Sequence, residues 1–180
     1  MSEFEYLAVF VSIIFGISVT HILRGIIRSI YRGEIDHTHF VLTAFLFFVL
    51  ILNWWVGFSW VNQEVWSFDL FIVIVIWSVS HYLAAITLYP PLSAGIEQPF
   101  EFRRNWFLWA FVGLGLADII QAIARGAVFT PRAYLPFVLH YMILAMLAIY
   151  IKRPWFYRVI AWYFLMSMLI WSFVVRRFLA

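Results

Sequence analysis

Six long apolar stretches, almost free of charge, constrain the fold of this chain more than any other feature. Charged residues collect in the short segments between the stretches. A helix of about 20 residues crosses the hydrocarbon core of a bilayer, and each stretch is close to that length. The pattern therefore predicts an all-α, polytopic membrane protein whose residues 1–180 form one domain, a bundle of six transmembrane helices. The predicted spans are 6–27, 40–61, 70–89, 105–124, 133–151 and 155–175.

Composition excludes several other classes of protein. Hydrophobic residues make up 66% and charged residues 12% of the 180 residues, which is too little polar surface for a soluble globule. Cysteine is absent, so disulfides, thiolate metal sites and cysteine nucleophiles are excluded. The net charge of +3 does not indicate nucleic acid, because the arginines lie at predicted helix ends beside lipid phosphates. The acidic start, with Glu3 and Glu5, predicts a retained first helix rather than a signal peptide.

The arginines and the single lysine predict the orientation of the bundle. Positively charged residues are enriched in cytoplasmic loops. One side of the predicted bundle carries Arg24, Arg28, Arg32, Arg103, Arg104, Lys152, Arg153 and Arg158. The other side carries Arg125, Arg132, Arg176 and Arg177. The first side should therefore be cytoplasmic, with both termini on the outer, periplasmic side of an inner (cytoplasmic) membrane.

A weak 3+3 internal repeat is also present in the sequence. A shift of 94 residues lays the first three stretches over the last three and aligns 76–78 with 170–172, both Ile-Trp-Ser. Inverted repeats are common in transporters. So few residues match that chance explains the register better than duplication.

Polar and ionisable side chains inside the apolar stretches are the candidate functional residues, because they are costly in hydrocarbon. Helical rise places His21 and His81 in one layer near the cytoplasmic boundary. It places Asn53, Asp118 and His140 in a second layer nearer the outer boundary. Such layers are typical of a relay or pore, and helix packing is the alternative reading for each residue.

A polar stripe along one predicted helix extends the second layer. Gln121 and Arg125 follow Asp118 at spacings of three and four residues, which places all three on one helical face. A carboxyl group at this depth needs a partner. Arg125 on the same helix or His140 on the next helix would neutralise Asp118, or the carboxyl group would be protonated.

Small residues at four-residue spacing predict close helix packing, because they let two backbones approach. The two sets are Ser12, Gly16 and Thr20, and Gly113, Ala117 and Gln121. Such faces serve packing within one chain or between protomers. Six short helices enclose little volume, so we expect a homo-oligomer.

One loop offers weak candidate metal ligands. Glu34, Asp36, His37 and His39 lie within six residues of one another, and carboxylates with imidazoles suit zinc or a similar ion. Ordinary loop polarity beside lipid headgroups explains the same residues equally well. No other cofactor is expected from this segment.

Three functions are compatible with these patterns. The first is a small channel or transporter that moves protons, an ion or a small polar solute. The second is electron transfer by one haem b held between His21 and His81, since the chain offers one histidine per helix. The third is a non-catalytic sensor or assembly subunit that binds a second membrane subunit. An enzyme is not expected, because no intramembrane protease, di-iron or retinal-lysine motif is present.

Overall fold

A computed structural model describes residues 2–33, 36–90 and 100–177. Within these ranges the chain has six α-helices and no strand, which confirms the predicted all-α class. The helices are α1 (Glu3–Arg32), α2 (His37–Gly57), α3 (Phe68–Leu88), α4 (Phe100–Ala124), α5 (Tyr134–Tyr150) and α6 (Pro154–Ile170). A 3₁₀ turn, η1 (Phe58–Asn62), continues α2, and a π-helical turn, η3 (Trp171–Val175), continues α6.

Local capping signals set where several helices begin and end. The Ser2 hydroxyl accepts the Glu5 N–H at 3.2 Å, and the Glu5 carboxylate accepts the Ser2 N–H at 2.9 Å, a capping box that starts α1. Gly33, with φ of 67°, ends the same helix in the left-handed conformation. Ser67 caps α3 by accepting the Leu70 N–H at 3.2 Å. The caps at Ser2 and Gly33 lengthen α1 beyond the predicted apolar stretch 6–27, because they satisfy backbone groups outside that stretch.

Five helices have the length and apolar composition of membrane spans: α1, α2 with η1, α3, α4, and α6 with η3. α5 has 17 residues and is the shortest of the six with α6; at 1.5 Å per residue it is about 26 Å long. Many large apolar side chains point away from the bundle, among them Tyr31, Trp106 and Val174. A soluble monomer rarely exposes so much apolar surface. These properties suggest a membrane location.

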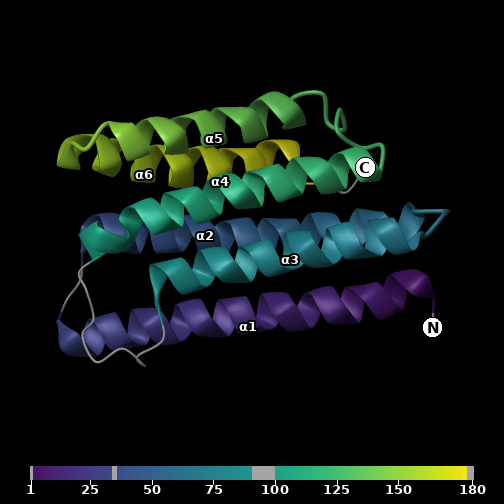
Figure 1. Ribbon diagram of the computed structural model, residues 1–180, viewed down its shortest axis with the longest axis horizontal. Helices are drawn as coiled ribbons and strands as arrows, with labels where there is room; N and C mark the ends of the chain where they lie inside the picture. Colours follow the sequence, from purple (N-terminus) through teal and green to yellow (C-terminus); the bar gives the residue numbers. More distant parts are fainter. Residues whose placement is uncertain (1, 34–35, 91–99, 178–180) are drawn as a thin grey trace.

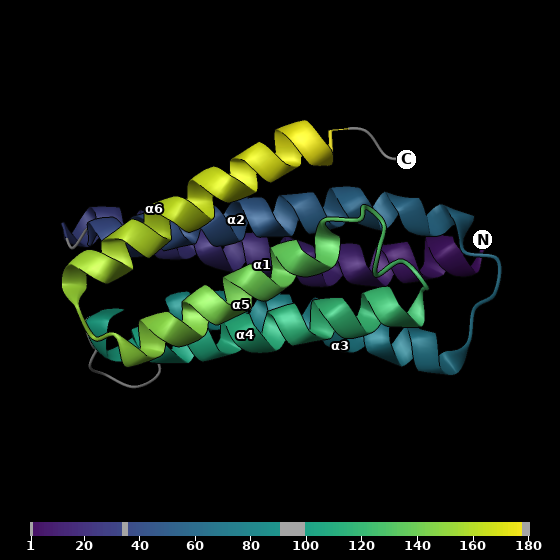
Figure 2. The same cartoon turned by 90° about the horizontal axis from the view of Figure 1, so that it is seen from above.

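The helices form two layers of three (Figures 1 and 2). α1, α2 and α6 make one layer, and α3, α4 and α5 make the other. The closest packing joins α3 to α4, α1 to α3, α2 to α6 and α4 to α5. Figure 2 shows that α1 begins and α6 finishes at the same end of the bundle. We call this the proximal end, and the end with the α5–α6 turn the distal end.

This packing does not follow the weak 3+3 repeat. The repeat would make α4 and α6 equivalent to α1 and α3. α1 packs along α3, whereas α4 and α6 are not among the closely packed pairs. The layers also place α6 beside α2 rather than beside α4. The structure therefore gives the repeat no support.

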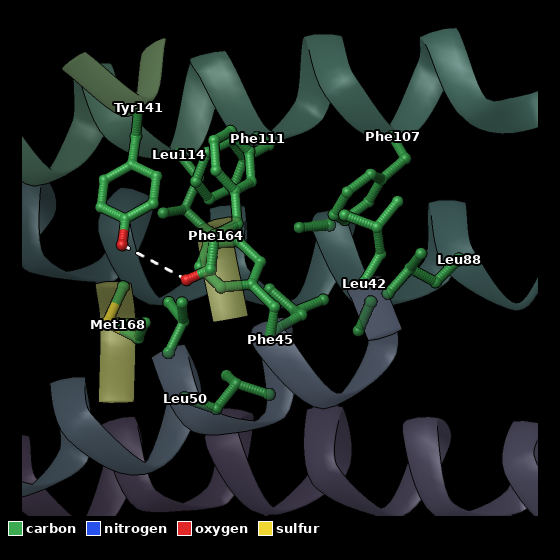
Figure 3. Close-up of a cluster of buried hydrophobic side chains, with 14 of the residues drawn as sticks. Leu42, Phe45, Leu50, Leu88, Phe107, Phe111, Leu114, Tyr141, Phe164 and Met168 are labelled. Atoms are coloured by element: carbon green, nitrogen blue, oxygen red, sulfur yellow. Dashed lines mark hydrogen bonds between the residues drawn. The ribbon is translucent and has the colours of Figure 1, made fainter. Parts of the chain in front are cut away.

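A cluster of aromatic rings fills the middle of the bundle between the layers (Figure 3). The Phe45 ring of α2 lies 5.2 Å from the Phe164 ring of α6 and 5.3 Å from the Phe111 ring of α4, centroid to centroid. Phe107 is fully buried beside them. The Tyr141 hydroxyl on α5 shares a 2.7 Å hydrogen bond with the Ser167 hydroxyl on α6. We call this group of rings the aromatic core.

Candidate functional site

A cavity of about 90 Å³ lies at the proximal end, between α2, α4, α5 and α6, with Trp77 of α3 in its wall. That volume has room for several water molecules, since one occupies roughly 10–15 Å³ by such a measure. The charged residues lining it are Asp118, Arg125 and Arg176. Its other polar and aromatic lining includes Asn53, Trp60, Trp77, Gln121, Tyr134 and Tyr141. Figure 2 shows α5 and α6 diverging from their distal turn toward this end. We call this space the proximal cavity.

Asp118 on α4 is the most buried charged residue of the cavity, with 9% of its surface exposed. The Trp77 indole N–H donates to its Oδ1 at 2.7 Å, and the Tyr134 hydroxyl donates to its Oδ2 at 2.7 Å. Gln121, one turn along the helix, donates to Oδ1 at 3.3 Å. The side-chain acceptors of Asp118 are therefore held by protein donors from α3, α4 and α5.

Neither of the two partners expected for Asp118 makes a direct hydrogen bond to it. No hydrogen bond or ion pair joins Asp118 to Arg125 or His140 within the described residues. Arg125 instead reaches it through Gln121, because the Arg125 Nε donates to Gln121 Oε1 at 2.8 Å. The spacing of three and four residues did predict this relay along one helical face.

Two guanidinium groups stand at the cavity beside this carboxylate. Arg125 lies 5.0 Å from the centre of the Trp60 ring, within cation–π range. Arg176, just after η3, donates to the Thr130 carbonyl at 3.0 Å. Burial lowers the pKa of Arg125 to about 10, opposed by the attraction of Asp118. Arg125 therefore stays protonated at neutral pH, as arginine does generally.

His81 on α3 and Asn53 on α2 form a second buried pair, one turn from Trp77. The His81 Nδ1–H donates to the Trp77 carbonyl at 2.8 Å, because a carbonyl can only accept. Its Nε2 therefore accepts from the Asn53 amide at 2.8 Å. Both ring nitrogens of His81 are occupied, and the imidazole is neutral in this arrangement.

The predicted assignment of the polar residues to two layers is therefore wrong. Asn53 pairs with His81, which was assigned to the other layer. His21 lies farther along, where its Nε2 donates to the Tyr89 carbonyl at the end of α3. Eight residues of helix separate His81 from Tyr89, about 12 Å of rise. His21 and His81 therefore belong to different levels of the bundle.

His21 and His39 both form hydrogen bonds to carbonyl groups at the distal end of α3. A helix that ends before a proline leaves its last carbonyls without backbone partners. The Leu88 carbonyl accepts from His39 Nε2 at 3.0 Å and from Arg103 at 3.3 Å, while the Tyr89 carbonyl accepts from His21. Donors from three neighbouring helices thus cap α3. These histidines hold the helix end in place.

Tyr89 is the centre of the same distal cluster. Its ring lies 4.6 Å from the His39 ring, and its hydroxyl shares a 3.2 Å hydrogen bond with Thr43. Burial raises the pKa of the Tyr89 hydroxyl. The ring also lies directly over Gly25 of α1, so that any Cβ at position 25 would collide with it. Gly25 is the glycine that lets α1 approach α3.

The candidate metal ligands do not converge. Glu34 lies outside the described residues. Asp36 Oδ1 accepts the His39 backbone N–H at 2.6 Å as the cap of α2. The His37 ring lies 5.7 Å from Trp162, while the His39 ring stacks on Phe100 at 4.3 Å. Within the described residues, no group of three potential ligands is positioned to hold a metal ion.

His140 stands apart from the other candidates. Its ring packs 4.3 Å from the Tyr141 ring and 5.8 Å from the Tyr163 ring, between α5 and α6. Its Nε2 is buried and has no hydrogen-bond partner in the described part of the chain. It is not among the residues that line the proximal cavity.

The predicted small-residue face of α1 lies mostly on the outside of the bundle, whereas that of α4 is mostly buried. Gly16, Thr20 and Gly113 are exposed, and nothing approaches the Cβ position of either glycine within 4 Å. Ser12 is half-buried and accepts a 3.2 Å hydrogen bond from exposed Trp54. Ala117 is buried. Within one chain, close packing uses Gly25 and also Gly115, which lies against the Met142 side chain of α5.

The histidines do not fit a bis-histidine haem. Both nitrogens of His81 are bonded to protein groups, and the Nε2 of His21 is bonded to the Tyr89 carbonyl. Axial ligation needs a free imidazole nitrogen from each. His81 therefore has no free nitrogen for a haem iron, and His21 lies at another level of the bundle.

Four residues that line the cavity were not predicted from the sequence: Trp60, Trp77, Tyr134 and Arg176. Trp77 had a usable signal, because it lies in the middle of an apolar stretch rather than at a membrane boundary where tryptophans gather. A buried indole N–H needs an acceptor. No protein-family model, curated protein or solved structure matches this chain.

Proposed function

We propose that this chain is a six-span protein of the inner membrane, with its termini outside, that transports a small polar solute or ion. The proximal cavity would be the outward-facing binding site. The observation that carries the proposal is the buried Asp118 in a cavity lined also by Arg125 and Arg176. Charged groups in hydrocarbon are costly and are usually kept where they bind or conduct something.

The arrangement of these charges supports binding more than simple packing. A buried ion pair that only fixes helix positions would bring opposite charges into direct contact. Here Gln121 stands between Asp118 and Arg125, and the three groups line an open space. The cavity therefore keeps charged groups beside a volume that a solute can occupy.

The aromatic core sets a requirement on any transport route. Phe45, Phe107 and Phe164 of this core are fully buried, so a solute would have to pass these rings. A solute would cross only if α5 and α6 move apart or if a route forms between protomers. α6 packs more closely on α2 than on α5, so the first route would require α6 to separate from α5.

A sensor or assembly subunit is the second candidate, and the filled aromatic core favours it. In that case the proximal cavity binds a solute without passing it on. Asp118, Trp77 and Tyr134 link three helices, so occupancy of the cavity would change their packing. Binding without flux separates this candidate from a transporter.

The absence of cysteine makes the topology directly testable. We would label Ala133→Cys, at the proximal end, and Lys152→Cys, at the distal end, with a membrane-impermeant maleimide. The proposal expects labelling of the first in intact cells and of the second only after permeabilisation. The reverse pattern would overturn the orientation and with it an outward-facing site.

Transport is tested in proteoliposomes. Proton, potassium and chloride fluxes are compared between the native chain, Asp118→Asn and empty liposomes. A transporter gives flux above the empty liposomes that changes in Asp118→Asn while the protein remains folded by circular dichroism. Flux equal to that of empty liposomes for all three probes, with a solute still bound, favours the sensor.

A further inference from the structure

We infer that the proximal cavity binds a small monovalent anion, such as a halide, nitrate or a short carboxylate, between Arg125, Arg176 and Trp60. This inference rests on the proposed function and names the class of solute. It depends on which donors and acceptors of the cavity are already used by the protein.

The side-chain acceptors that α4 contributes to the cavity each receive a protein donor. Asp118 Oδ1 receives the N–H groups of Trp77 and Gln121, and Oδ2 receives the Tyr134 hydroxyl. The Gln121 carbonyl receives the Arg125 Nε–H. A cation entering the cavity would have to share the carboxylate oxygens with these donors. The site is therefore poorly arranged for a cation.

Two groups of the cavity, by contrast, have N–H donors without an acceptor among the described residues. The Trp60 side chain is 3% exposed, and its indole N–H is buried with no acceptor among the described residues. Native proteins leave few buried donors unsatisfied. The terminal nitrogens of Arg125 also have no hydrogen bond within the described residues, and guanidinium carries five N–H donors. A ligand rich in acceptors would satisfy them.

The charges point the same way. Among the residues lining the cavity, two guanidiniums stand against one carboxylate, so one positive charge remains to be balanced. A single monovalent anion balances it. Burial among Phe111, Leu114 and Trp171 strengthens such attraction, because the local dielectric is low.

The geometry also fixes where the anion sits. Trp60 lies against Arg125 and Trp77. The Arg125 guanidinium is 5.0 Å from the centre of the Trp60 ring, and the Trp77 ring is 5.1 Å from it. The Arg125 guanidinium thus lies over the face of the Trp60 ring, and both residues line the cavity. The volume of about 90 Å³ suits an anion of a few heavy atoms rather than a nucleotide or a lipid headgroup.

The test is calorimetric titration of purified, detergent-solubilised protein with sodium nitrate and sodium acetate, at constant ionic strength set with a large sulfonate. Arg125→Gln and Trp60→Phe should each weaken nitrate binding at least tenfold. Arg132→Gln is the matched control, because Arg132 is an exposed arginine of the same loop that does not line the cavity. It should bind nitrate like the native chain.

The change in nitrate binding caused by Asp118→Asn distinguishes an anion site from a cation site. Removing the negative charge should strengthen nitrate binding, whereas a cation site would lose its ligand. Circular dichroism and thermal unfolding confirm that each variant folds. Binding of potassium or guanidinium, lost in Asp118→Asn and without nitrate binding, would overturn the anion and leave the proposed function standing. Binding of neither anions nor cations by the native chain would overturn both.

Discussion

The indole N–H of Trp77, in the middle of α3, donates a 2.7 Å hydrogen bond to Oδ1 of Asp118 on α4. α3 and α4 form the most closely packed pair of helices in the bundle. A hydrogen bond to a charged group is stronger than one between neutral groups, and its loss leaves the acceptor unsatisfied. This single contact therefore joins the packing of the bundle to the chemistry of the proximal cavity.

We expect Trp77→Phe to destabilise the protein by about 1–3 kcal/mol, the usual cost of a buried polar group without its partner. The ring is largely kept, so most of the loss comes from the hydrogen bond. Unfolding in mixed micelles with increasing SDS measures it. Trp109→Phe on exposed α4 surface is the control and should change stability little. Equal effects of the two substitutions would contradict the role of Trp77.

The pair of Asn53 and His81 allows a double-mutant cycle. Asn53→Ala removes the donor to His81 Nε2, and His81→Phe removes the acceptor while keeping a ring. Interacting residues show coupling energies of about 0.5–3 kcal/mol. We expect a coupling in that range, measured by the same unfolding assay. Additive effects would mean that the two side chains do not interact in the membrane.

Gly16 tests the predicted homo-oligomer. It is exposed on α1 with open space around it, beside half-buried Ser12 and exposed Thr20. If this face joins two protomers, Gly16→Cys should form disulfide-linked dimers in membranes treated with a mild oxidant. Leu116→Cys on the exposed face of α4 is the control. Similar cross-linking at both positions would indicate random collision rather than a specific interface.

Much of the fold followed from the sequence, because a helix that lies in lipid must be apolar along its whole length. The six apolar stretches correspond to the six helices, with ends displaced by a few residues. The displacements have local causes, such as the Ser2 capping box that starts α1 early and the 3₁₀ turn that extends α2 to Asn62.

The pairings between helices could not be predicted from the sequence, because the depth of each side chain was measured from predicted helix ends. An error of one helical turn moves a side chain by about 5.4 Å. Asn53 and His81 were assigned to separate layers for this reason, although they form a hydrogen bond. Sequence also gives no rotation of one helix against another, so Trp77 and Tyr134 were missed as the partners of Asp118.

The last prediction concerns Gly25, where the Tyr89 ring occupies the space of a side chain. Gly25→Ala forces this ring away from Thr43 and His39, whose contacts help to close the distal end. Overpacking of this kind costs about 1–3 kcal/mol. Gly16→Ala is the matched control on the same helix, since it meets nothing within 4 Å.

Unfolding in SDS should therefore separate the two glycines, with Gly25→Ala destabilised and Gly16→Ala close to the native chain. Tyr89→Leu combined with Gly25→Ala supplies the second arm, because a smaller side chain frees the space for the new methyl group. The double variant should lose less than the sum of the single effects, as expected for residues in direct contact. Full additivity would show that α1 and α3 do not meet at Gly25 and Tyr89, and the distal cap of α3 would then need another explanation.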